Sequence, residues 1–390
     1  MTVRTNIASI SWGDHLTFGE GDGRLKTWEA FARRLDNWRD ELGTGILHWR
    51  YLASRVPGTL HLARHLGRSR RTGGDPPPWD DLKRVPALAH AAGLKAFLYV
   101  TIFDEGRPLV GRAARERSHH NPFHGKDSCW ESDFVRDHPE FLSLDRAGRR
   151  RHWGVPCLAY AEVRRHFRDL YAGLVRESDF DGLFVCLRSQ SRPPDHADQF
   201  GYNEPVRRDF RDRYGIDITK EDFEKDAWRD LLGEYISKFL RELHSDLAAS
   251  GSALALGIPR GDVLGPPLGN ASLDWREWAD EGFLDHLVID QDSTRCPSMW
   301  IDLWPMHRGE GYVQDYRRGC GLPPLEAHVA SQYGPAFRSS NTDLFVARQW
   351  RRREAKAESA ILSLPGVRGL AFSTFRHDNP GALARNDWRA

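Results

Sequence analysis

Acidic residues that follow apolar runs are the side chains best placed to do chemistry. Asp290 comes directly after the apolar run 284–289, and Gln291 beside it is a good partner for hydroxyl groups. Glu326 lies in another such segment, and Asp104 directly follows a third. Hydrolysis of a glycosidic bond needs two carboxyl groups that flank the scissile bond. We therefore predict Asp290 and Glu326 as the catalytic pair, without assigning their roles, and keep Asp104 as a reserve.

The tripeptide Asn203–Glu204–Pro205 offers a further carboxylate. It resembles the Asn-Glu-Pro that many retaining glycosidases place at the end of their fourth strand, with the Glu as acid/base. In this chain it comes after a loop, at the start of an amphipathic helix. Pro205 suits a first helical turn, and Asn203 or Glu204 could instead cap that helix. Glu204 is a second reserve, and Asn203 is a candidate sugar ligand.

Other polar side chains cluster at or just past the C-terminal ends of apolar runs. In a parallel α/β barrel these ends converge on one mouth, where crowded charges shift pKa values as acid/base catalysis requires. Any one of these residues could instead pair with a neighbour and only neutralise the mouth. The candidate substrate-binding residues taken from this pattern are His15, His48, Arg50, Tyr99, Arg188, Gln190, Gln291, Asp292, His328 and Gln332.

The elements that position these residues alternate along the chain. Short apolar runs, typical of strands buried on both faces, are separated by segments with helical spacing of apolar residues. The predicted strands are 7–12, 45–52, 95–103, 182–187, 253–258, 284–289, 325–331 and 369–375. The predicted helices are 28–42, 79–92, 162–176, 222–249, 274–281 and 342–363, with a further helix within 298–316 and a short one in 132–141.

Eight strands alternating with helices predict a (β/α)8 TIM barrel of class α/β. No linker or repeat divides residues 1–390, so we expect one domain. The polar segment 106–154 predicts long βα loops, which in compact proteins are often functional.

Composition limits the possible partners. The chain has 390 residues, 28% of them charged, and a formal net charge of +1. Acidic residues balance the basic clusters, which argues against nucleic acid as a partner. The 14 tryptophans belong mostly in a core, although a few could stack on sugar rings. The composition does not indicate an oligomeric state.

Cofactors and membranes are not expected. The five cysteines and the HHNPFH segment lack zinc-ligand spacing, and no phosphate-binding or dinucleotide motif occurs. We predict no metal and no cofactor. The first residues lack the apolar core of a signal peptide and no apolar run is long enough to span a bilayer, so we expect a cytoplasmic protein.

Five phrases in order resemble the glycoside hydrolase family 10-like proteins of bacteria, a group of TIM-barrel glycosidases. They are HPEFLSLDRAGRRR, CLAYAEVRRHFRDLYAGLV, DGLFVCLRS, FGYNEPVRRDFRDRYGIDI and WRDLLGEYISKFLREL. The resemblance covers the middle third of the chain and implies a barrel that acts on carbohydrate. It also implies that Tyr160 and Arg188 lie at the mouth. Many relatives carry an Asp in or after the fourth strand, where this chain has Val185, Cys186 and Leu187.

We therefore predict a glycoside hydrolase that acts on a poly- or oligosaccharide. The arginines at strand ends favour an anionic sugar. One alternative is a barrel that binds carbohydrate without hydrolysing it, which the absent strand-four carboxylate favours. Another is a barrel lyase or isomerase, in which a histidine or tyrosine removes a proton next to a carboxylate.

Overall fold

The computed structural model describes residues 4–10, 28–51, 81–108, 128–188, 194, 196–265, 267–291, 311–313, 322–349 and 354–373. Within these ranges, no helix is both long and apolar enough to cross a membrane.

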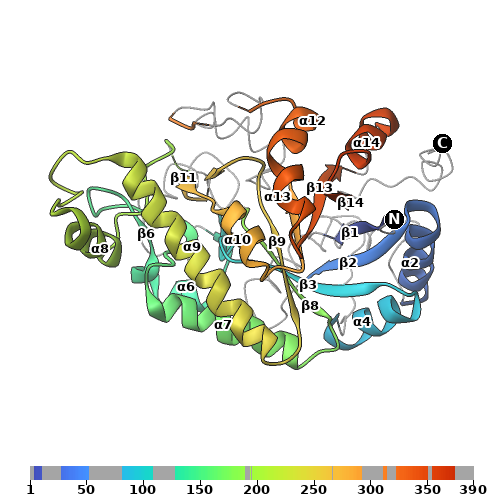
Figure 1. Ribbon diagram of the computed structural model, residues 1–390. Coiled ribbons are helices and arrows are strands. Elements are labelled where there is room, and N and C mark those ends of the chain that lie inside the picture. Colours follow the sequence, from blue (N-terminus) through green and yellow to red (C-terminus); the bar gives the residue numbers. More distant parts are fainter. Residues whose placement is uncertain are drawn as a thin grey trace.

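Eight parallel strands close into a barrel (Figure 1). β1 pairs with both β2 and β14, which joins the first and last strands of the described chain. This closure confirms the (β/α)8 fold. In barrel order from the first strand, the strands are β1 (Asn6–Ile10), β2 (Thr44–Arg50), β3 (Lys95–Thr101), β8 (Gly182–Cys186), β9 (Ala253–Gly257), β12 (His286–Ile289), β13 (Asp343–Gln349) and β14 (Val367–Ser373).

Helices follow the strands and cover the barrel from outside. The helices predicted at 28–42, 79–92, 162–176, 222–249 and 274–281 begin and end close to those bounds. The helix predicted within 298–316 falls largely outside the described residues. The described helices are α2 (Trp28–Leu42), α4 (Asp81–Ala91), α7 (Ala161–Arg176), α8 (Glu204–Tyr214), α9 (Lys225–Ala248), α10 (Trp275–Glu281), α12 (Leu325–His328), α13 (Gly334–Arg338) and α14 (Ala355–Leu362).

The long βα segments carry small elements of their own. After β3 come two antiparallel pairs with a short helix between them, and after β9 comes a third pair. β6 and α8 lie together at one side of the molecule, at the left of Figure 1. The elements are β4 (Gly106–Pro108), β5 (Ser128–Glu131), α6 (Asp133–Asp137), η1 (Pro139–Phe141), β6 (Leu142–Leu144), β7 (Arg151–Pro156), β10 (Val263–Gly265) and β11 (Gly269–Ser272).

The predicted seventh strand was wrong. Residues 325–331 form α12 and the start of the π-helical turn η2 (Val329–Tyr333). Val329 and Tyr333, four residues apart, are both fully buried, so one helical face packs on the core. The true seventh strand, β13, begins the segment 342–363 that we predicted to be helical. Leu344, Phe345 and Val346 pair with both neighbouring strands, and this pairing overrides helix propensity.

Most of the tryptophans whose side chains the structure describes serve as core. Among the described residues, five are essentially inaccessible to solvent, and they fill the layer between strands and helices. They are Trp38, Trp49, Trp228, Trp275 and Trp278.

The barrel interior contains an unusual polar pair. His48 stacks on Phe184 with ring centroids 3.9 Å apart, and its Nε2 lies 2.8 Å from Nε2 of His286. Nδ1 of His286 in turn lies 2.8 Å from a carboxylate oxygen of Asp285. If His286 donates to Asp285, its Nε2 accepts the N–H of His48. Both imidazoles are fully buried. His48, predicted as a sugar ligand, therefore lies inside the barrel.

This buried pair predicts that acid destabilises the fold. Burial and the neighbouring His286 lower the pKa of His48 well below its ordinary value. As the pH falls, His48 therefore binds a proton in the unfolded chain at a higher pH than in the folded protein. The free energy of unfolding then decreases below pH ~6.5, by up to about 1.4 kcal/mol for each pH unit. His48→Gln keeps an N–H donor but cannot titrate. Urea unfolding at pH 7, 6 and 5 should show a shallower loss of stability in this variant.

The matched control is His244→Gln, which removes a histidine from the outer helix α9. Its pH dependence should equal that of the wild type. An unchanged pH dependence in His48→Gln would contradict the assignment of the acid sensitivity to the barrel interior.

Candidate active site

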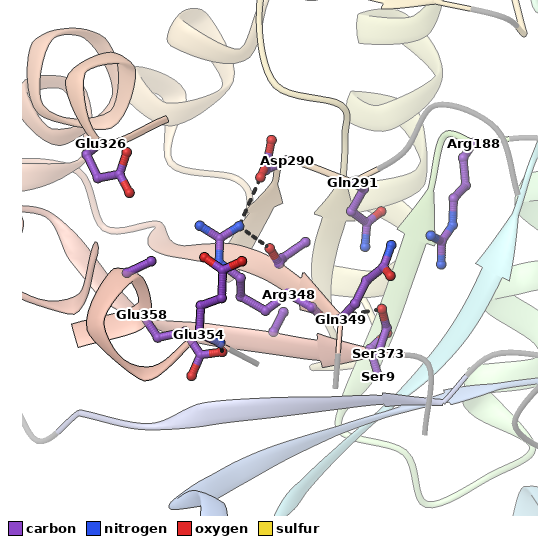
Figure 2. A pocket seen from close by; sticks show the side chains of 13 residues that line it. Ser9, Arg188, Asp290, Gln291, Glu326, Arg348, Gln349, Glu354, Glu358 and Ser373 are labelled. Atoms are coloured by element: carbon purple, nitrogen blue, oxygen red, sulfur yellow. Dashed lines mark hydrogen bonds and ion pairs between the residues drawn. The ribbon is translucent and has the colours of Figure 1, made fainter. Parts of the chain in front are cut away.

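A cavity of about 420 Å³ opens where the strands β12, β13, β14 and β1 end. Figure 2 shows polar side chains from these strands, from α12 and from α14 projecting toward it. Among the described residues, no aromatic side chain lines it. The polar residues that line it are Ser9, Arg188, Asp290, Gln291, Glu326, Arg348, Gln349, Glu354, Glu358 and Ser373.

Asp290 is held between two arginines from neighbouring strands. Its Oδ2 accepts from Nη1 of Arg348 at 3.0 Å, and its Oδ1 lies 3.3 Å from Nε of Arg260. Arg260 follows β9, and Arg348 belongs to β13, so three adjacent strands contribute to this cluster. The two guanidinium groups stabilise the negative charge of the carboxylate.

The backbone of Asp290 is also distinctive. Its φ is +63°, and among the described residues it is the only non-glycine with a positive φ. Asp tolerates this left-handed region better than most residues, yet the conformation still costs free energy. Strained backbone conformations of this kind often occur at functional sites, where they hold a side chain in a required direction. Here the strained residue carries a carboxylate that lines the cavity.

Glu326 also lines the cavity, although it lies on a helix and not on a strand. It is the second residue of α12, and its side chain forms no ion pair with another described residue. Figure 2 shows it on the far side of the cavity from Gln291 and Arg188. The two carboxylates predicted as a pair therefore share one cavity.

Sequence reasoning missed several lining residues. Arg348 and Gln349 end the true seventh strand, and Glu354 and Glu358 belong to the turn and helix that follow it. Glu358 is 3% exposed, and its Oε1 accepts from the backbone N–H of Glu354. The apolar run directly before Arg348 could have been interpreted as a strand, which would have placed Arg348 at a strand end. Ser9 and Ser373 carried no such signal.

A second polar cluster lies across the mouth, on β2, β3 and β8. Nη2 of Arg50 lies 3.4 Å from Asp104, and both side chains are buried. The guanidinium of Arg50 also lies over the ring of Tyr99, whose hydroxyl accepts from Nη2 of Arg188 at 2.8 Å. Arg188 reaches the cavity, whereas Asp104 and Tyr99 are fully buried and do not line it.

Glu105 follows Asp104 in the chain. It is half-buried beside Asp104, and burial raises its pKa to about 7. A hydrogen bond with Ser132 and the positive charge of Arg50 oppose this shift. A carboxyl group that titrates near neutrality suits proton transfer, although Glu105 is not among the residues that line the cavity.

Several predicted residues lie away from the cavity. Glu204 is exposed at the first turn of α8, with Arg208 at 3.7 Å. The side chain of Asn203 instead bridges Leu142 and Leu144 of β6 by two hydrogen bonds of 2.9 Å. These contacts indicate a structural role for the tripeptide.

The remaining predicted residues divide into two groups. Tyr160 precedes α7 and packs on Phe141, while Gln332 accepts from Arg276, and His328 lies beside Tyr333. None of these three predicted residues lines the cavity. The predictions for His15, Gln190 and Asp292 lie outside the described residues.

The charges at the cavity limit the argument for an anionic sugar. Arg348 and Arg260 both pair with Asp290, which leaves Arg188 as the remaining cation among the described lining residues. Four carboxylates line the same space. No group of three or more His, Cys, Asp or Glu residues in the described part of the chain is arranged to hold a metal ion.

The chain is similar to several solved structures of carbohydrate-active enzymes. The glycoside hydrolase domain of PgaB (BpsB) from Bordetella bronchiseptica is 12% identical, with a TM-score of 0.51 and 98% of each chain covered. A β-galactosidase from Bacillus circulans sp. alkalophilus is 10% identical, with a TM-score of 0.46, 95% of this chain covered and 50% of that one. A class V chitinase from Pseudomonas fluorescens Pf-5 is 9% identical, with a TM-score of 0.41 and 98% of each chain covered.

At these identities, the likeness to the PgaB domain shows the barrel fold alone. No protein-family model matches the chain, and no curated protein matches it either. The resemblance to the family 10-like proteins therefore stays a prediction.

The raised pKa of Glu105 predicts a second pH effect, opposite in sign to that of His48. Because the folded state keeps this proton up to about pH 7, ionisation costs stability as the pH rises from about 4.5 through 7. Glu105→Gln has no such proton to lose. Thermal unfolding between pH 5 and 8 should show a smaller loss of stability with rising pH in Glu105→Gln than in the wild type.

Glu162→Gln is the matched control, because Glu162 is an exposed carboxylate in the first turn of α7. It should leave the slope between pH 5 and 8 unchanged. Equal slopes for Glu105→Gln and the wild type would mean that Glu105 ionises freely in the folded protein.

Proposed function

We propose that this barrel is a glycoside hydrolase that acts on a poly- or oligosaccharide, with Asp290 and Glu326 as its catalytic carboxyl groups. The observation that carries the proposal is that both side chains line one cavity at the C-terminal mouth. Glycoside hydrolases generally flank the scissile bond with two carboxyl groups, and TIM barrels place their active sites at this mouth. The barrel likeness to the PgaB glycoside hydrolase domain is consistent with this proposal.

The surroundings of the two carboxyl groups suggest different roles. Asp290 lies between two guanidinium groups, so it suits the task that needs a negative charge, either nucleophile or base. Glu326 forms no ion pair with another described residue and is free of that electrostatic bias. The role of general acid in this proposal therefore falls to Glu326.

The substrate includes neutral as well as anionic glycans in this proposal. The prediction of an anionic sugar depended on arginines at strand ends. One of these, Arg260, is paired with Asp290, as is Arg348 of β13. The resemblance to the bacterial family 10-like proteins supports carbohydrate in general and no particular sugar.

A non-hydrolytic carbohydrate-binding barrel is the second candidate. It is favoured by β8, whose last residue, Cys186, is an uncharged thiol where relatives by resemblance carry an acid. A lyase is less well supported, because Tyr99 and His48 are both fully buried and are poorly placed to take a proton from substrate.

Catalysis by this pair predicts a specific pattern of losses. Neutral and acidic polysaccharides should be screened for reducing ends released by wild type, Asp290→Asn and Glu326→Gln. On a glycan that the wild type cleaves, each variant should lose about 100-fold or more in kcat, the usual contribution of a positioned acid or base. Circular dichroism should show that both variants fold, since Asp290→Asn leaves two guanidinium groups unpaired.

Glu204→Gln provides the matched control, because it removes an exposed carboxylate away from the cavity. It should retain activity within about two-fold. Full activity in Asp290→Asn and Glu326→Gln, with loss in Glu204→Gln, would move the site to α8. Products with an unsaturated, ultraviolet-absorbing end would indicate elimination, and glycan binding without any product would indicate the binding barrel.

A further inference from the structure

Gln291 presents an amide to the cavity from a fixed position. It follows β12, and its side chain is only 7% exposed although it lines the cavity (Figure 2). Its backbone N–H donates to the carbonyl of Ile258 at 3.2 Å, which ties the residue to the end of β9. The residue is thus anchored at its backbone, and the orientation of its amide depends on what its side chain contacts.

The side chain of Gln291 contacts a thiol. Sγ of Cys186, the last residue of β8, donates to Oε1 of Gln291 at 3.0 Å, and both groups are buried. Burial raises the pKa of this thiol, so it keeps its proton and remains a donor at neutral pH. A thiol that donates must face the amide oxygen, which leaves the amide NH2 directed away from β8.

A glycine makes room for this contact. Gly257 of β9 pairs in register with Cys186 on one side and with Val288 on the other. A Cβ at position 257 would overlap Oε1 of Gln291 and would lie 2.6 Å from the ring of Phe184. Any larger residue at this position would therefore displace the amide from its place above the strand.

The cavity has a second uncharged polar group near its floor. Ser9 of β1 is 2% exposed, lines the cavity, and its Oγ has no hydrogen-bond partner among the described residues. A buried hydroxyl is normally satisfied by protein, water or ligand. Figure 2 shows Gln291 and Gln349 next to each other near Ser9, with Asp290 and Glu326 farther to the left.

From this arrangement we propose that Cys186 is a positioning residue, whose thiol fixes the amide of Gln291 so that its NH2 group donates to a sugar hydroxyl held beside Asp290. The inference rests on the proposed hydrolase function and adds a specificity element to it. Gln291 contacts the substrate, and Cys186 acts through Gln291. The strand position that lacks a carboxylate thereby acquires a role in orienting the substrate.

The first test compares Cys186→Ala, which loses the donor, with Cys186→Ser, which keeps one. The substrate is a glycan that wild type cleaves in the polysaccharide screen. Cys186→Ala should raise KM by about 3- to 10-fold, the usual effect of one neutral hydrogen bond, with a smaller change in kcat. Cys186→Ser should restore KM to within about two-fold of wild type. Cys157→Ala removes a buried thiol elsewhere and should change neither constant.

A double-mutant cycle separates positioning from general packing. In a Gln291→Ala background, Cys186→Ala should raise KM no further, because the thiol has no amide left to orient. Additive effects of the two substitutions would overturn the inference. So would a wild-type KM in Cys186→Ala.

An infrared measurement tests the contact without any glycan. The S–H stretching band that disappears in Cys186→Ala belongs to this thiol. Removing the acceptor in Gln291→Ala should move the band to higher frequency, whereas an unmoved band would overturn the inference. If Cys186→Ala fails to fold, the band that disappears in Cys186→Ser identifies the same thiol. If no glycan yields product, the proposed function and this role fail together. If wild type is active and Cys186→Ala matches it, only the positioning role fails.

Discussion

Closure of the parallel barrel is the constraint on which the rest of the structure depends. Because β1 pairs with β14 as well as with β2, most inward side chains are shielded from solvent and must fill the interior with their own volume. Phenylalanines and the paired imidazoles of His48 and His286 do this. A filled interior leaves no channel, so substrate can meet the protein only where the strands end. The cavity beside Asp290 is such a place.

Charges at that mouth must be balanced, and the two sides of the mouth do this differently. Arg50 and Asp104 form a pair that is closed off from the cavity. Asp290 pairs with Arg260 and Arg348 but still lines the cavity, because Asp290 adopts a positive φ at the end of its strand. The first cluster neutralises the buried guanidinium group of Arg50, and the second neutralises the half-buried groups of Arg260 and Arg348. Leaving such a charge without a partner costs stability. Only the second keeps its carboxylate where a ligand can reach it.

The sequence predicted the barrel well because apolar strands and amphipathic helices carry strong local signals. The exception, strand seven, shows the limit of local signals: residues 325–331 can form a strand or a helical face, and only pairing with β12 and β14 selects β13. Asp290 and Gln291 were found because they directly follow a strand. Glu326 was predicted at the cavity as part of a strand, but it reaches the cavity from the helix α12. Arg348 was missed with its strand.

The uncharged residue at the end of the fourth strand, β8, explains why the candidate catalytic carboxylates lie on one side of the mouth. Cys186 lies near the charges of Arg188, Arg50 and Asp104, which all influence its thiol. A carboxylate at this position would compete with Asp104 for Arg50 and would repel the amide oxygen of Gln291. The uncharged thiol avoids both conflicts, so Arg50 stays with Asp104 and the amide keeps its orientation. The carboxylates that line the cavity are then Asp290 beside β12, Glu326 on α12, and Glu354 and Glu358 at α14, while Gln291 and Ser9 offer uncharged groups suited to sugar hydroxyls.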